Sequence, residues 1–265
     1  MKRRHSRTPA GPPVALVTGA AQRIGREIAL ALAHAGFDVA VHYGRSRTGA
    51  LATVADIRKS GRRACAVKRD LAAASGVGSM LEQCAAELGE VTCVVNSAAL
   101  FEQDTALDFD SARLTRHMRV NVAAPVLLAR QLHQRIADGG QGVVINLLDQ
   151  KLWNPNPDFF SYTLSKAALC SAIGLLAREL APKLRVVGVA PGITLPASGQ
   201  SQRSFERVSQ LTALGYPSSP QDIAQAVVYL ARARAVTGTT LLVDAGQHLV
   251  PSERDVMFLH GGPRR

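Results

Sequence analysis

The stretch "VALVTGAAQRIGREIALALAHAG" (residues 14–36) decides the fold. Residues 14–18 lack polar alternation, which predicts a strand buried on both of its faces. Residues 25–36 follow a helical pattern that ends at Gly36, a residue type that commonly caps helices. A strand, a glycine-containing loop and a helix in this order are typical of an α/β protein.

The same alternation continues along the chain. It predicts further strands near 38–43, 63–67, 92–96, 142–148, 184–190 and 239–244, and helices near 47–60, 75–88, 110–137, 161–180 and 220–232. We therefore expect an α/β fold, a single-domain Rossmann-type doubly wound parallel sheet of about seven strands with helices on both faces. The domain should span residues 14–250, between a disordered basic tail (1–13) and a C-terminal extension (251–265). Residues 193–217, which are rich in Ser, Gln and Pro, are the candidate for a mobile substrate lid.

Composition narrows the possible functions. The chain has 265 residues, of which 47% are hydrophobic, and a formal net charge of +11. There is no apolar run of about 18 residues, so we expect no membrane span. The N-terminus lacks the apolar stretch of a secretory signal, which predicts a cytoplasmic protein. The positive charges form no stripe, so we expect an anionic cofactor or substrate and no nucleic acid. The cysteines show no metal-binding spacing, and we expect no metal.

The loop "TGAAQRIG" (18–25) is suited to a dinucleotide. Gly19 permits a tight turn, and Gly25 lets the helix pack closely on the strand. The N-terminus of the helix, next to Ile24, then offers free N–H groups to a pyrophosphate. A plain turn between a strand and a helix is the alternative interpretation.

The stretch "HYGRS" (42–46) indicates which cofactor is used. NAD sites place an acid at the end of the second strand, and none is present here. Arg45 and Ser46 could instead hold a 2′-phosphate, and Arg23 can reach the same region. We therefore expect NADPH, unless these arginines are only solvated surface charges.

Tyr162 and Lys166 lie four residues apart, on one face of the predicted helix 161–180. A lysine ammonium beside a tyrosine favours the phenolate, so we expect Lys166 to lower the pKa of Tyr162. Such a tyrosine can deliver a proton while a hydride reaches the substrate.

Over residues 14–250 the chain resembles the short-chain dehydrogenase/reductase family. The resemblance rests on the glycine loop, "DL" (70–71), "NSAA" (96–99), Asn121, "YTLSK" (162–166) and "PG" (191–192). It implies that Asn121 supports a water relay to Lys166 and that the protein is a homotetramer built on the helices near 110–137 and 161–180. The cofactor-binding residues that we expect are Gly19, Arg23, Ile24, Gly25, His42, Tyr43, Arg45, Ser46, Asp70, Leu71, Ser97, Ala98, Ala99, Tyr162, Lys166, Pro191, Gly192 and Thr194.

One position departs from the common pattern of this family. Asp149, thirteen residues before Tyr162, stands where most members have a serine. A serine hydroxyl donates a hydrogen bond to a ketone, whereas an ionised carboxylate only accepts. Aspartate here resembles the pteridine reductase branch, including the dihydromonapterin reductases, as do Arg23 and an aromatic residue at Phe101.

That resemblance implies a small-molecule, pterin-like substrate. Arg23, Phe101, Asp149 and Tyr162 would bind it, and Asp149, Tyr162, Lys166 and Asn121 would form the catalytic set. Hydride would reach a C=N carbon, Tyr162 would supply the proton, and Asp149 would orient the ring or assist proton delivery. A 3-oxoacyl or general ketone reductase is the alternative, and a cofactor-binding regulator without turnover is a third possibility. The apolar segment 254–259 could pack on a neighbouring subunit or over the active site.

Overall fold

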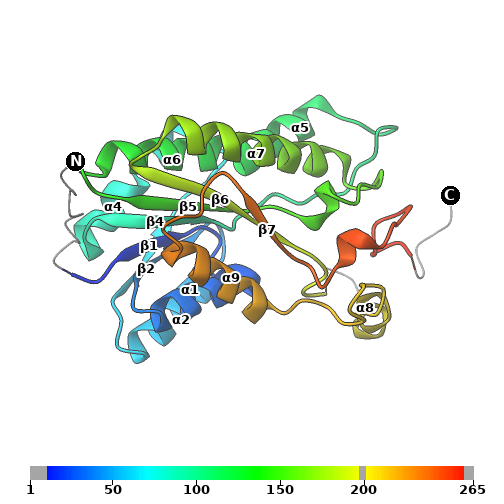
Figure 1. Ribbon diagram of the computed structural model, residues 1–265, viewed down its shortest axis with the longest axis horizontal. Helices are drawn as coiled ribbons and strands as arrows, with labels where there is room; N and C mark the ends of the chain where they lie inside the picture. The colour runs from blue at the N-terminus through cyan, green and yellow to red at the C-terminus, as the bar shows by residue number, and fades with distance from the viewer. Residues whose placement is uncertain (1–10, 197–200, 260–265) are drawn as a thin grey trace.

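The computed structural model describes residues 11–196 and 201–259. Within them, parallel strands form one sheet in the order β3-β2-β1-β4-β5-β6-β7 (Figure 1). The strands are β1 (Val14–Val17), β2 (Asp38–Tyr43), β3 (Ala64–Lys68), β4 (Val91–Asn96), β5 (Gly142–Leu147), β6 (Leu184–Pro191) and β7 (Thr240–Val243). This is the predicted doubly wound α/β fold, and the near-continuous apolar strands are those of a sheet covered on both faces.

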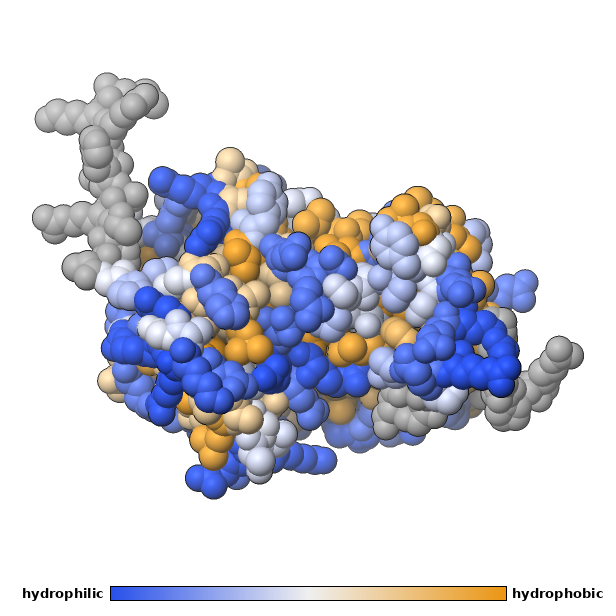
Figure 2. Space-filling model, turned by 90° about the horizontal axis from the view of Figure 1, so that it is seen from below, coloured by the Kyte–Doolittle hydropathy of each residue, from blue (hydrophilic) through white to orange (hydrophobic). Residues whose placement is uncertain are grey.

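Helices cover both faces of the sheet (Figure 1). One core layer joins the sheet to α1 (Arg23–His34), α2 (Arg47–Lys59) and α9 (Pro220–Arg232). The opposite layer joins it to α3 (Ala74–Val77), α4 (Met80–Leu88), α6 (Ala124–Arg135) and α7 (Phe160–Glu179). Figure 2 looks at the molecule from below Figure 1 and shows hydrophilic residues interspersed with hydrophobic patches.

The strand order places a crevice at the centre of the sheet. Chain connections run outward from β1 to β2 and β3, and then return to β4 on the other side of β1. Val17 near the end of β1 pairs with both Val41 of β2 and Val95 of β4. Ligands of open parallel sheets bind beyond the carboxyl ends of the strands at such a reversal. The predicted site residues should therefore meet there.

Three predicted segments differ from the structure. The helix predicted at 75–88 is divided into α3 and α4. The long helix predicted at 110–137 consists of α5 (Ser111–Met118), a π-helical turn (Arg119–Ala123) and α6. The looser stretch 193–217 contains α8 (Gln202–Ser209), whose Ser201 side chain caps its first turn. Residues 1–10, 197–200 and 260–265 of the predicted tail, lid and extension lie outside the described residues.

One helix among the described residues, α7, is long and apolar enough to cross a bilayer by length and composition alone. Core helices of globular proteins have the same property. α7 packs on β6 and α5, although its Leu164 and Leu175 side chains are exposed, the latter by 71%. The helix thus has one apolar side in the core and a second on the surface.

Candidate active site

The loop between β1 and α1 has the shape that a pyrophosphate requires. A Cβ atom at position 25 would lie 2.3 Å from the carbonyl oxygen of Gly19, so only glycine fits there. Gly19 itself adopts a φ of +67° against the backbone of Ala98. No side chain caps the first turn of α1, where Gln22 precedes Arg23, and its N–H groups can bind an anion.

Buried polar side chains hold this loop from behind. The Thr18 hydroxyl accepts hydrogen bonds from the N–H groups of Ser97 and Ala98, both at 3.0 Å. His42 accepts a hydrogen bond from the Gly19 N–H at Nδ1, and its Nε2 lies 3.1 Å from the Arg69 carbonyl. Burial lowers the pKa of His42, which keeps the ring neutral. Both ring nitrogens are therefore engaged inside the protein, and the His42 ring supports the loop. Its contact with the cofactor stays a prediction.

The region expected to bind the 2′-phosphate lies where β2 leads into α2. Tyr43 is buried at the end of β2, whereas Arg45 is exposed and Ser46 half-buried immediately before α2. The stretch 42–46 contains no carboxylate that would repel a phosphate. In the turn after the neighbouring strand β3, Leu71 is buried and Asp70 accepts a hydrogen bond from the Ala72 N–H. These residues fit NADPH.

A cavity of about 440 Å³ brings most of the predicted cofactor residues together. Its lining includes Gly19, Arg23, Ile24, Gly25, Ser97, Ala98, Ala99, Asp149, Tyr162, Lys166, Pro191 and Gly192. Thr194, in contrast, donates its hydroxyl to the Gly192 carbonyl, 2.8 Å away, and contacts Ser218. Its side chain therefore braces the turn after β6, and it lines the adjoining cavity instead.

Tyr162 and Asp149 form a buried pair at the floor of this cavity. The Tyr162 hydroxyl donates to Asp149 Oδ2 at 2.9 Å, and the Lys151 N–H donates to Oδ1 at the same distance. Burial raises the pKa of Asp149. Burial and the neighbouring Asp149 raise the pKa of Tyr162 well above its ordinary value. The prediction that Lys166 lowers this pKa is therefore wrong for this structure, because desolvation and the carboxylate disfavour the phenolate.

Lys166 and Asn121 connect the pair to the scaffold. The Lys166 ammonium donates to the Leu147 carbonyl at 2.6 Å and lies 5.6 Å from the centre of the Tyr162 ring. Burial lowers the pKa of Lys166 to about 8. Asn121 sits in the π-helical turn, where it hydrogen bonds to both backbone groups of Leu100 and to the Ser165 hydroxyl. It thereby fixes the loop after β4 against α7.

Aromatic side chains form one wall beside Tyr162 and Asp149. Phe101 stacks on Phe159 with ring centres 4.2 Å apart, and it meets Tyr162 edge to face at 4.7 Å. Phe101, Phe159 and Asp149 line a second cavity of about 550 Å³, which also contains Arg23. Phe101 is 46% exposed, so a face of its ring remains available to a planar ligand. The predicted substrate residues Arg23, Phe101 and Asp149 thus share one cavity, and Tyr162 lines the adjoining one.

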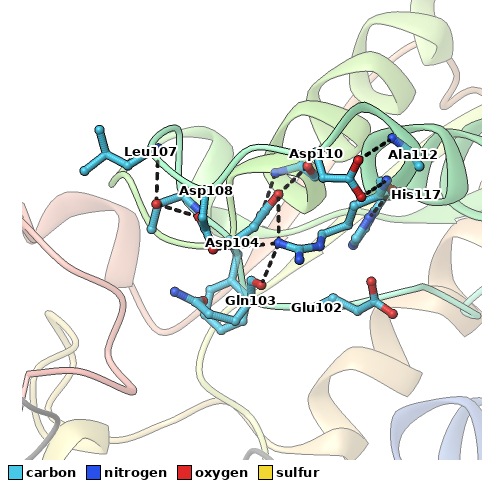
Figure 3. Close-up of polar contacts among 12 residues, drawn as sticks. Glu102, Gln103, Asp104, Leu107, Asp108, Asp110, Ala112 and His117 are labelled. Atoms are coloured by element: carbon cyan, nitrogen blue, oxygen red, sulfur yellow. Dashed lines mark hydrogen bonds and ion pairs between the residues drawn. The ribbon is translucent and has the colours of Figure 1, made fainter.

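A loop ahead of α5 holds the start of α7 in place (Figure 3). The buried Asp104 accepts hydrogen bonds from the N–H and hydroxyl of Ser161, the residue next to Tyr162. Arg113 from α5 donates to the Gln103 carbonyl and lies 4.0 Å from Asp104. Asp110 caps α5 through the N–H groups of the following turn. This network orients the start of the helix that carries Tyr162.

The C-terminal segment completes the second cavity. Asp255, Val256 and Met257 line it, so the apolar segment at 254–259 packs over the candidate site. Asp255 pairs with the buried Lys151 at 3.2 Å, and Arg254 makes two bonds of 2.8 Å to Asp158. Sequence reasoning missed Lys151 and Asp158, since partners 96 or more residues away show no local pattern. It also missed Gln150, which belongs to no recognisable motif.

Comparisons with known proteins agree with this geometry. A family model described as enoyl-(acyl carrier protein) reductase matches residues 19–248. The crystal structure of FolM alternative dihydrofolate reductase 1 from Brucella suis, in complex with NADP, is 39% identical with a TM-score of 0.87, covering 91% of this chain and 97% of that one. The angucycline C-6 ketoreductase LanV with bound NADP is 32% identical with a TM-score of 0.83, covering 89% and 96%. The 3-oxoacyl-[acyl-carrier-protein] reductase FabG of Staphylococcus epidermidis is 28% identical and covers 89% and 98%.

Proposed function

The chain belongs to the short-chain dehydrogenase/reductase family, and we propose that it uses NADPH to reduce a C=N bond of a pterin. As a member of this family it is an NADP-dependent oxidoreductase, and similar structures hold NADP. The glycine loop, the uncapped N-terminus of α1 and the exposed Arg45 suit that cofactor. When bound, NADPH supplies the hydride.

The carboxylate of Asp149 is the observation that favours a pterin over a ketone as the substrate. It faces the cavity at a position where a ketone oxygen would need a hydrogen-bond donor, and an ionised carboxylate can only accept. A dihydropterin offers amino and ring N–H groups that can donate to it. Phe101 beside Asp149 presents an aromatic face on which a planar ring can stack.

The proton is supplied by Tyr162. Its raised pKa keeps the phenol protonated, and its single proton, which Asp149 accepts in the free protein, would turn to a ring nitrogen that gains negative character during reduction. Asp149 holds the hydroxyl at 2.9 Å and orients it. Lys166, whose pKa is about 8, lies behind the Tyr162 ring and supports the transfer electrostatically. Arg23, which lines both cavities, contacts the ring from the cofactor side.

The test is NADPH oxidation with dihydrobiopterin or dihydromonapterin, measured beside an acetoacetyl thioester. We expect turnover of a dihydropterin. Tyr162→Phe should abolish reduction and leave NADPH binding nearly unchanged, because the phenyl ring keeps the packing. Turnover of the thioester alone would refute the proposal and favour the ketone reductase alternative, which the similarity to FabG supports.

Asp149→Ser separates the two chemistries. It replaces an acceptor with a hydroxyl that can donate, and it should lower dihydropterin turnover relative to turnover of a ketone. Equal dihydropterin rates in the two proteins would show that the carboxylate has no part in substrate choice.

A further inference from the structure

Gln150 follows Asp149 directly and has a buried amide that the fold does not use. The residue is 7% exposed, and its Oε1 has no hydrogen-bond partner among the described residues. Gln150 lines the same cavity as Asp149, Phe101 and Phe159. Buried side-chain amides are nearly always hydrogen bonded, since a lost partner leaves the full desolvation cost in place.

The backbone around Gln150 is firmly held, so the turn does not shift to give the amide a partner. Gln150 opens the short helical turn Gln150–Leu152, which Asp149 caps through the Lys151 N–H. Lys151, next along, is 3% exposed and paired with Asp255. Asn154 donates to the Val250 carbonyl at 2.8 Å. The turn is therefore fixed at its start, in its middle and just beyond its end.

A second glutamine in the same cavity shows what a structural amide looks like. Gln247 is 8% exposed, and its Oε1 accepts a hydrogen bond of 2.8 Å from the Ile193 N–H. Gln150 and Gln247 thus share residue type, burial and cavity. Only Gln247 is used to hold the backbone, which leaves the Gln150 amide free for a ligand.

We propose that Gln150 is a substrate-recognition residue whose amide hydrogen bonds to the pterin ring beside Asp149. This inference rests on the proposed function. The amide supplies one acceptor and two donors, whereas Asp149 supplies only acceptors. Together they match a heterocycle that carries N–H and C=O groups on one edge. Gln150 and Asp149 would then hydrogen bond to that edge of the ring, and its face would stack on Phe101.

Gln150→Met tests the proposal because methionine keeps the length of the side chain and removes the amide. Binding of an oxidised pterin in the presence of NADP⁺ can be followed by quenching of Trp153, the sole tryptophan of the chain. We expect the pterin dissociation constant to rise about tenfold, the factor that corresponds to 1.4 kcal/mol. With dihydropterin, KM should rise with little change in kcat, and KM for NADPH should stay the same.

The urea midpoint of the ligand-free protein gives a second measurement. It should rise in Gln150→Met, because an unpaired amide is replaced by an apolar group of similar shape. It should fall in Gln247→Met, the matched control, which leaves the Ile193 N–H unpaired. A lower midpoint in Gln150→Met, or an unchanged pterin dissociation constant, would overturn the inference.

The two proposals fail in different ways. A wild-type protein that binds pterin without reducing any dihydropterin would refute the proposed function and leave the role of Gln150 standing. If the wild-type protein reduces dihydropterin and Gln150→Met has the same KM for it, the role of Gln150 alone is refuted. A wild-type protein that binds no pterin would overturn both.

Discussion

Asp149→Asn should stabilise the free enzyme while impairing it as a catalyst. Asparagine keeps both contacts, because its Oδ1 can accept from the Lys151 N–H and its Nδ2 can donate to Tyr162. The hydrogen-bond contributions then cancel, and the cost of burying a charge disappears. Lys166 loses a nearby anion, which offsets part of the gain. We expect a net increase in the free energy of unfolding on the order of 1 kcal/mol at pH 7.

The pH dependence identifies the cause. Burial raises the folded-state pKa of Asp149 above its unfolded value, so the protonated carboxyl is the form that the fold prefers. The wild-type protein therefore has this stability below the unfolded pKa of about 3.9 and loses it as the pH rises through the folded pKa. Urea unfolding of both proteins between pH 4 and pH 8 should show a stability difference that grows with pH.

Subtracting the wild-type free energy of unfolding from that of Asp149→Asn at each pH removes the contributions of the other carboxylates. Asp38 and Asp158, whose pKa values are lowered, are present in both proteins. A difference that stays constant over this range, or a less stable Asp149→Asn at pH 7, would refute the account of Asp149 as a buried charge kept for function. Dihydropterin turnover by the same variant should fall.

Further changes probe the cofactor site, the C-terminal segment and the surface of α7. Arg45→Ala should raise the apparent constant for NADPH much more than that for NADH, measured by initial rates, because only NADPH carries the 2′-phosphate. Asp255→Asn should lower the free energy of unfolding by roughly 2 kcal/mol, since it leaves the Lys151 ammonium buried without its partner; the double variant with Lys151→Met should recover much of that loss in urea unfolding. We propose that the exposed face of α7, where Leu175 is 71% exposed, is a subunit contact of a homotetramer; Leu175→Glu should then lower the mass measured by light scattering, and an unchanged mass would exclude that face as a subunit contact.

The sequence was sufficient to predict the sheet and most of the site because both depend on local patterns. Apolar strands alternate with helical segments, and the glycine loop lies between the first pair. The helical spacing of Tyr162 and Lys166 likewise predicted that they would share one environment. The resemblance predicted that Phe101 lies near Arg23 and Asp149, and the structure places all three in one cavity, where Phe101 stacks on Phe159.

What the sequence could not show depends on burial and on distant partners. The pKa of Tyr162 was predicted with the wrong sign, because spacing reveals the nearby lysine and not the desolvation or the carboxylate. His42 lies in the expected stretch, yet its ring is used inside the fold. The Lys151–Asp255 pair joins residues 104 positions apart, and no local pattern marks either of them.

The substrate cavity draws on both ends of the described chain, since Arg23 and Met257 line it together. The cofactor cavity is lined by residues up to Gly192 in the sequence, and no residue of the segment 254–258 lines it. Residues 254–258 are held to the rest by the ion pairs of Asp255 with Lys151 and of Arg254 with Asp158, by the hydrogen bond from the Asp255 N–H to Asp158, and by the contact between the Phe258 and Phe159 rings. Local opening of that segment costs less than global unfolding. As urea is added, the enzyme should therefore lose substrate binding at a lower urea concentration than NADPH binding. The C-terminal segment would then determine the highest urea concentration at which the enzyme is active.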